Sequence, residues 1–494
     1  MTEDISQLSA LTVWKELDIS RMATKSNGMR ALTNVGLTST AAFCLGLILQ
    51  IVAYQNIEAP FAGIFFLLLG SCIFHRISPL GGRHEINAFL LFFSVCYFWS
   101  GVAGIYSVYL DDVSQKADAS WFFDLASGMG YGLTLFELRG LTEGSGAVFM
   151  WRAIYDLVSS IGFQKGPYIA VAFNTFLVSI AGVFAIKTVR VIFSHDQHRV
   201  ARFLRLFTMC GVFWLFAAIL LRDSSVLLLN TLLVYVWVCY LMRPQWATAV
   251  LLVVFSVIST AIFEYLRTEF FFVPVVMRVA GAGAIFVQGQ LSRLSGVMSM
   301  LLIIGVLGLF IFILPSSPKD LADLLVSGHD QYAEMASDDG AGHGSLGMAY
   351  VVNQPIPVRL AIGSFYLQVF PIPFWSGLYV QSIYHLLKSL NAIFMWFVVP
   401  LAILGVRRSL QVKEKPKKAA LVFLTFVYAG FTVAIAGTSL ETRHLGAFLV
   451  PLLIVATVPD LMFLPDVRIF RRLLSAWLGL IMFIHIGWVI LKVF

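Results

Sequence analysis

Long apolar runs of about 20 residues, separated by short polar breaks, recur along almost all of this 494-residue chain. Such a run is long enough to cross a bilayer as a helix. Inside the hydrocarbon every backbone N–H and C=O must be bonded internally, which permits only helices and closed barrels. Barrel strands would be short and alternating. Only 12% of the residues are charged, against about 25% in soluble domains. The sequence therefore predicts an all-α polytopic integral membrane protein, with residues 1–494 forming a single membrane domain.

Twelve or thirteen transmembrane helices are expected, and basic residues set their orientation. Lys and Arg collect on the cytoplasmic side of membrane proteins, and here they cluster in residues 15–30, 187–205 and 407–418. This bias, rather than nucleic-acid binding, explains the formal net charge of +7. The clearest runs are residues 37–54, 59–74, 86–109, 167–186, 206–221, a sixth run ending before Arg243, 247–263, 296–314, 392–404, 420–436, 447–464 and 476–491.

One further crossing is expected between residues 268 and 290. The run 296–314 must lead outward if the acidic stretch after it is external, so the chain has to return first. Arg278 interrupts this apolar segment. We therefore expect a broken or tilted helix there.

Two long segments, residues 110–165 and 315–386, are predicted to lie outside, because acidic residues outnumber basic ones in their polar parts. In the first, residues 146–163 carry apolar side chains at helical spacing but are too short to span, which predicts a helix lying in the interface. In the second, the moderately apolar part 358–379 is expected to be re-entrant or interfacial.

Most candidate chemistry thus collects on the external side. Two tight external turns carry Arg222-Asp223 and Arg443-His444. Charge at the membrane boundary is costly and often functional, although Arg222 could equally form a local ion pair that snorkels to headgroups.

The external stretch HDQYAE adds His329, Asp330 and Glu334. These are plausible ligand types, but their spacing matches no strong zinc motif, so no metal is expected. The alternatives for these side chains are solvated loop charge and contact with a substrate.

The cytoplasmic side lacks Walker, Rossmann and kinase-like glycine motifs. This argues against an ATP-driven pump and against an enzyme that uses a cytosolic nucleotide donor, and no cofactor is expected. The five cysteines fall in or beside apolar runs, where small buried side chains are the expected role.

Three features together resemble the bacterial oligosaccharide repeat-unit polymerases of the O-antigen polymerase (Wzy) type. The first is the tight external pair Arg222-Asp223 between two spans. The second is an external segment that passes from Arg359 to a Pro-x-Pro-x-Trp bend ending at Trp375. The third is the late turn Gly437-Thr438 to Arg443-His444, followed by an apolar run that begins GAFLVPLLIVA.

The resemblance implies a GT-C-like fold in the bacterial inner membrane and a metal-independent glycosyltransferase facing the periplasm. Such enzymes transfer a glycan chain from undecaprenyl diphosphate to an incoming lipid-linked repeat unit, building O-antigen, capsule or exopolysaccharide. The implied partners are the undecaprenyl-diphosphate-linked oligosaccharide, membrane lipid and a chain-length regulator, without nucleic acid.

Site roles follow from what the reaction requires. Arginines bind the leaving diphosphate in a bidentate manner, and a His or carboxylate serves as base for the acceptor hydroxyl. We expect Arg222, Arg359 and Arg443 to converge on one external cavity with a His within reach. The diphosphate candidates are Arg222, Arg359, Arg443, Arg139 and Arg152, and the base candidates are His329, His444, Asp330 and Glu334.

Two other classes remain open. An O-antigen ligase, or another glycosyltransferase that uses a polyprenyl-linked sugar, differs mainly in its acceptor. A flippase or transporter of lipid-linked oligosaccharides would also have many spans, but charges inside the spans and short loops on both sides would be expected. The long external segments favour the enzyme.

Overall fold

The computed structural model describes most of the chain, and the described residues form helices and turns without a strand among them. They are residues 36–77, 83–110, 112, 118–128, 145–194, 196–266, 270, 272–289, 351 and 354–493. The all-α class is therefore confirmed for this part of the chain.

Nine helices in the described part are long and apolar enough to cross a membrane, or ten if the bent pair α9–α10 counts as one span. These lengths and compositions support a multi-pass membrane protein. The nine are Gly36–Tyr54, α2 (Glu58–Ile77), α3 (Arg83–Tyr109), α8 (Pro167–Phe193), α11 (Asp223–Met242), α12 (Trp246–Leu266), α19 (Ile383–Leu410), α20 (Lys415–Gly437) and α23 (Leu464–Val493). The shorter helices are α5 (Asp118–Ser127), α7 (Ser145–Ser160), α9 (Gln197–Thr208), α10 (Gly211–Ala218), α13 (Phe272–Gln288), α17 (Ile356–Val369), α18 (Ser376–Tyr379), α21 (Thr442–Gly446) and α22 (Leu449–Val455).

Three expected crossings take a different form. Residues 206–221 include the end of α9 and all of α10, two helices that are bent by 53° at their junction. The expected crossing at 268–290 is α13, an apolar helix of 17 residues that is shorter than the other spans. The expectation of one continuous helix over 447–464 is wrong, because α22 ends at Val455. Residues 296–314 lie outside the described part, so the expected total of twelve or thirteen is not reached within it.

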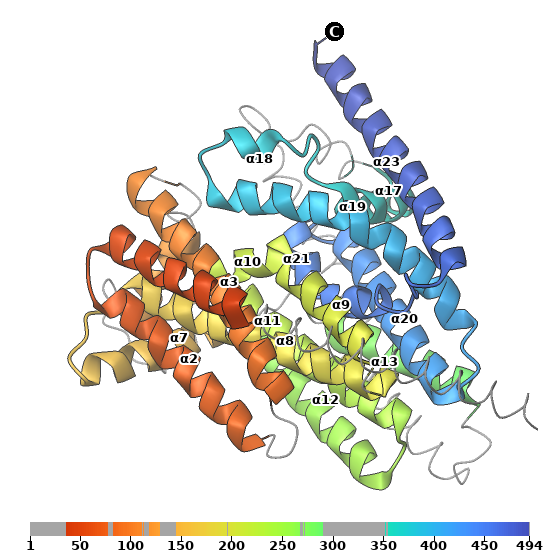
Figure 1. Cartoon of the computed structure of the whole chain (residues 1–494), viewed down its shortest axis with the longest axis horizontal. Coiled ribbons are helices and arrows are strands. Elements are labelled where there is room, and N and C mark those ends of the chain that lie inside the picture. Colours follow the sequence, from red (N-terminus) through yellow and green to blue (C-terminus); the bar gives the residue numbers. More distant parts are fainter. Residues whose placement is uncertain are drawn as a thin grey trace, which may run out of the picture.

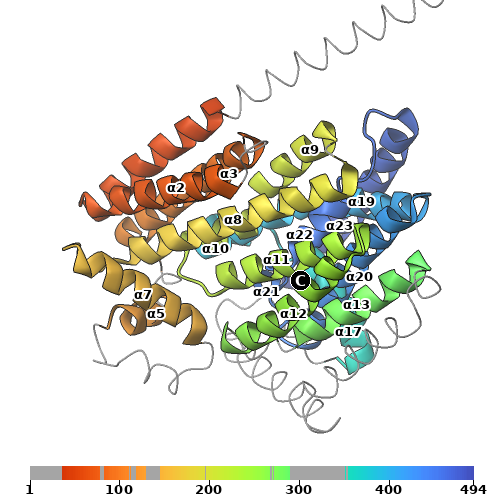
Figure 2. The same ribbon diagram turned by 90° about the horizontal axis from the view of Figure 1, so that it is seen from below.

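Helix α8 lies at the centre of the bundle. It packs against α2, α3, α10 and α11, and 83% of its most apolar window is buried, whereas the value for α23 is 11%. Figure 2 shows α8 between the α2–α3 pair on one flank and α11 with α12 on the other. In Figure 1, α23 stands at the edge of the molecule. The chain thus buries its middle helices in protein and leaves its outer helices for lipid.

At the breaks between α9 and α10 and between α10 and α11, asparagine side chains form hydrogen bonds with backbone groups that lack their helical partners. At the start of α10, the Val212 N–H donates to Asn391 Oδ1 at 3.2 Å. At its end, Asn174 Nδ2 donates to the carbonyls of Ile219 at 3.3 Å and Leu221 at 3.2 Å. A helix break at membrane depth requires such replacement partners, since water is absent.

A third asparagine serves the break between α21 and α22. Pro451 has no N–H, so the carbonyl of Ala447, four residues earlier, lacks its usual helical donor. Asn230 Nδ2 donates to that carbonyl at 3.1 Å. The break therefore lies at the start of the predicted span 447–464, and within that span α22 reaches only to Val455.

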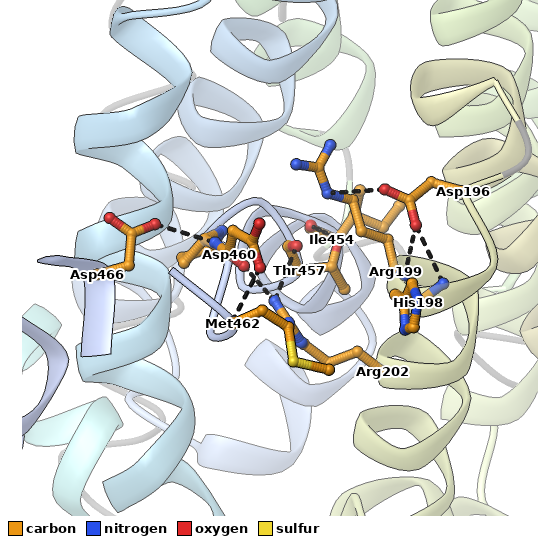
Figure 3. A network of polar contacts seen from close by, with 10 residues as sticks. Asp196, His198, Arg199, Arg202, Ile454, Thr457, Asp460, Met462 and Asp466 are labelled. Atoms are coloured by element: carbon orange, nitrogen blue, oxygen red, sulfur yellow. Dashed lines mark hydrogen bonds and ion pairs between the residues drawn. The ribbon is translucent and has the colours of Figure 1, made fainter. Parts of the chain in front are cut away.

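The basic end of the bundle is closed by contacts between α9 and the segment after α22 (Figure 3). Asp196 caps α9 by accepting the N–H groups of His198 and Arg199 at 3.0 Å and 3.3 Å. Arg202 donates to the carbonyl of Thr457 at 3.2 Å. The segment that leaves α22 therefore reaches the end where the basic residues cluster.

The turn before α21 lies at the opposite end. Near the C-terminus of α19, Arg408 pairs with Asp466, and near its N-terminus Lys388 pairs with Glu441. A rise of about 1.5 Å per residue over these twenty residues separates the two pairs by about 30 Å. Residues 441–458 therefore cross the bundle as two short helices.

Both predicted external segments contain helices where they are described. In the first, α5 and α7 pack together, with Trp151 and Tyr155 of α7 fully buried while Phe149 and Leu157 are exposed. A helix is thus present where one was predicted over 146–163, and its place in the membrane interface stays a prediction. In the second, α17 covers the part expected to be re-entrant or interfacial.

Candidate functional site

The turn from Thr438 to Glu441, between α20 and α21, gathers charged side chains from three elements. Leu440 has φ of 50°, a left-handed conformation that is uncommon for a bulky residue and reverses the chain here. Glu441 caps α21, its carboxylate accepting the N–H of Arg443 at 3.5 Å. We call this turn, with the side chains of Arg359, Lys388, Arg443 and His444, the 438–444 cluster.

Lys388 and Glu441 form the central ion pair of the cluster. Lys388 Nζ lies 2.6 Å from Glu441 Oε1, and the Tyr384 hydroxyl donates to the same oxygen at 3.0 Å. The Lys388 ammonium also lies 4.4 Å from the centroid of the Tyr384 ring. Lys388 is only 8% exposed, so this pair is shielded from water and its removal on one side would leave a buried charge.

The charge of Glu441 is set by its two cationic neighbours. Burial disfavours the carboxylate and by itself raises the pKa, but Lys388 and Arg443 outweigh that effect and lower the pKa of Glu441 to about 2. Glu441 is therefore ionised at any physiological pH.

Arg359 fixes the turn from the side of α17. Its Nε donates to the Ala436 carbonyl at 3.1 Å and its terminal nitrogen to the Thr438 carbonyl at 2.6 Å. These are the last carbonyls of α20, which otherwise lack donors. Burial lowers the pKa of Arg359, but an arginine stays protonated. Arg359 therefore places a positive charge directly beneath the turn.

Arg443 and His444 lie side by side with different exposures. Arg443 is half-buried, its guanidinium 5.9 Å from the Tyr384 ring centroid. His444 is 1% exposed, its Nδ1 hydrogen-bonded to Ser439 Oγ at 2.7 Å and its ring packed edge-on to Phe270. Of the two, Arg443 is the better placed to reach a substrate, and His444 holds the turn in shape.

The remaining arginines of the prediction form a second group. Arg222, at the N-cap of α11, lies over the Phe122 ring at 5.1 Å. Arg152 pairs with Asp156 at 3.1 Å within α7. The rings of Phe122 and Trp151 are 5.8 Å apart, so both arginines belong to the α5–α7 side. Arg359, Arg443 and His444 thus lie at the same turn, whereas the guanidinium of Arg222 contacts α5. Arg139, His329, Asp330 and Glu334 lie outside the described residues.

Sequence reasoning missed Lys388, Tyr384 and Asp112. A signal for Lys388 was present, since a single Lys inside an apolar run is costly unless it is paired. Asp112, 1% exposed, accepts the Ile383 N–H at 2.8 Å and so fixes the start of α19. That contact spans 271 residues of sequence and could not be read from local pattern.

Within the described residues no group of three or more His, Cys, Asp and Glu side chains is arranged to hold a metal ion. No protein-family model, curated protein or solved structure matches this chain. The function is therefore inferred from the contacts above.

Proposed function

We propose that this protein polymerises lipid-linked glycans at the outer face of the bacterial inner membrane, in the manner of the Wzy-type polymerases it resembles. The observation that supports the proposal is the 438–444 cluster, where Arg359, Lys388 and Arg443 gather around one turn at the end of the bundle opposite the basic end. A diphosphate leaving group requires several cations held at one place.

In the proposed reaction, a sugar hydroxyl of the incoming repeat unit attacks the anomeric carbon of the glycan chain carried on undecaprenyl diphosphate. The bond from that carbon to the diphosphate oxygen breaks, and undecaprenyl diphosphate leaves as an anion. The hydroxyl proton passes to a base. Energy comes from the glycosyl diphosphate, so neither ATP nor a nucleotide sugar is consumed.

The residues of the 438–444 cluster have different proposed roles. Arg443, half-buried, receives the diphosphate, while Arg359 holds the turn and adds positive potential. Lys388 and Glu441 orient Arg443 through the cap of α21. Because His444 is fully buried and bonded to Ser439, we assign it to positioning, and His329, Asp330 and Glu334 remain the proposed bases.

Complementation tests the proposal. In the host strain deleted for this gene, wild type and Arg407→Ala should restore long surface glycans, whereas Arg443→Ala should reduce polymerisation about a hundredfold or more. Arg407 is the control because it is exposed at the basic end. Glycan length on the lipid carrier and at the cell surface is measured on gels, with protein level checked by blotting.

The deletion strain separates the classes. Single repeat units at the surface fit a polymerase. Long chains that stay on the carrier indicate a ligase, and repeat units retained on the cytoplasmic leaflet indicate a flippase. Either of the last two results rules out the polymerase.

A further inference from the structure

Arg278 is a buried cation with few partners. It lies in α13 and is 4% exposed. Its Nη2 donates to Thr260 Oγ1 at 3.3 Å, and its Nη1 has no hydrogen-bond partner. Among the described residues no carboxylate lies within 4.0 Å of it. A guanidinium has five N–H donors, so most of its bonding capacity is left for something else.

Other arginines with little exposure in this chain have carbonyl or carboxylate partners. Arg359 meets two backbone carbonyls, Arg190 pairs with Glu85, and Arg408 pairs with Asp466. An unpaired charge in the interior is strongly unfavourable. Arg278 departs from this pattern in the described part of the chain, so its guanidinium is available to a further, anionic partner.

The surroundings of α13 show from which side such a partner can come. Gly281 lies so close to α11 that a Cβ there would be 2.3 Å from the Trp237 ring, and a Cβ on Gly430 of α20 would be 2.7 Å from Val276. These two sides are closed. Thr260 belongs to α12, whose apolar window is only 22% buried. The guanidinium therefore points to the helix that faces the membrane.

Arg278 is also close to the 438–444 cluster. The Phe270 ring, just before α13, packs against His444 with centroids 6.0 Å apart. Arg278 follows Phe272, the first residue of α13, by six residues, which is about 9 Å along the helix. Figure 2 shows α12 and α13 together at one flank of the bundle.

We propose that Arg278 binds the phosphate group of a membrane lipid that enters between α12 and α13. Two parallel N–H···O bonds from one guanidinium to a phosphate are the geometry that arginine favours. Thr260 positions the guanidinium, since its own hydroxyl proton is donated to the Ser256 carbonyl at 2.7 Å.

The identity of the lipid rests on the proposed function. A polymerase handles two polyprenyl diphosphates at once, one that gives the glycan and one that carries the acceptor. The 438–444 cluster serves one of them, and Arg278 is placed to hold the other. The phosphate site itself stands without that assumption.

Native mass spectrometry of the purified full-length protein tests both the phosphate site and the identity of the lipid. The probes are undecaprenyl diphosphate, phosphatidylglycerol and inorganic diphosphate. Arg278→Met should weaken binding of undecaprenyl diphosphate at least tenfold, Arg278→Lys less, and the distant control Arg407→Met not at all. Equal binding of all three probes by wild type and Arg278→Met would overturn the phosphate site. Loss of phosphatidylglycerol alone keeps the phosphate site and overturns the substrate assignment.

Thermal unfolding of the delipidated protein tests whether Arg278 has only a structural role. Because no carboxylate of the described residues pairs with Arg278, Arg278→Met should keep or raise Tm, since a buried charge is replaced by an apolar chain of similar length. A lower Tm with unchanged lipid binding overturns the site. If Arg443→Ala still supports long glycans while Arg278→Met loses the lipid, the proposed role of the 438–444 cluster fails and the Arg278 site stands.

Discussion

At the scale of single residues, Glu441 connects several functions of one turn. It caps α21, pairs with Lys388 and accepts the Tyr384 hydroxyl. A carboxylate at this position fixes the place of Arg443 through the backbone, because the Arg443 N–H donates to it.

Glu441 makes stability depend on pH. The pKa is lowered from 4.5 to about 2 on folding, so its contribution is fully present above pH 4.5 and is lost as pH falls towards 2. The shift corresponds to about 3 kcal/mol. Denaturant unfolding of the detergent-solubilised protein, measured at pH 6 and at pH 3, should show wild type losing a part of that amount. Glu441→Gln should lack this part of the acid dependence, and an unchanged slope in the variant would contradict the assignment.

Residue pattern predicted part of this site. Arg359, Arg443 and His444 were recognisable because each stands at the edge of an apolar run or in a tight turn. Their relation to Lys388 was not, because the Lys388–Glu441 pair joins α19 to the turn after α20 and depends on how these helices pack. The deep burial of His444 was equally beyond local pattern, since its residue type and turn position suggested access.

At the scale of elements, three breaks between helices depend on asparagines from neighbouring helices. Asn174 of α8, Asn230 of α11 and Asn391 of α19 each bond backbone groups at a break. Apolar runs predicted where helices lie, but the breaks come from Pro451 and from packing. The lengths of the apolar runs predicted continuous spans at 206–221 and 447–464, whereas the structure bends the first between α9 and α10 and ends α22 at Val455.

Asn174 is the most demanding of these contacts. It donates to two carbonyls and accepts the Trp151 indole N–H at 3.0 Å. Asn174→Leu should lower the free energy of unfolding by at least about 1 kcal/mol, since buried carbonyls lose their donors. The control is Asn56→Leu, a residue that caps the start of α2 instead of serving a break. The measurement is thermal unfolding in detergent. An equal loss of stability in both variants would count against the special role of Asn174.

At the scale of the whole molecule, charge divides the two ends of the bundle. Clusters such as 407–418 lie at one end, and the 438–444 cluster lies at the other. The number of helices that could cross was predicted less well than this polarity, because length alone does not show whether a short apolar helix such as α13 crosses fully.

This difference in charge between the two ends predicts which end faces each side of the membrane. Gln381 and Gln411 flank α19 at its two ends, and both are exposed. In a background without the five native cysteines, Gln381→Cys should react with a membrane-impermeant maleimide in intact spheroplasts, and Gln411→Cys should react only after lysis. The reverse pattern would place the 438–444 cluster in the cytoplasm and exclude a periplasmic reaction.

The hydrogen bond between Val212 and Asn391 also constrains the order in which the fold can form during synthesis. These residues are 179 positions apart, and the chain is made from its N-terminus. While a ribosome is still producing α11, α12 and α13, the first turn of α10 already exists without its acceptor. During biosynthesis the Val212 N–H therefore lacks its final acceptor until α19 has been made.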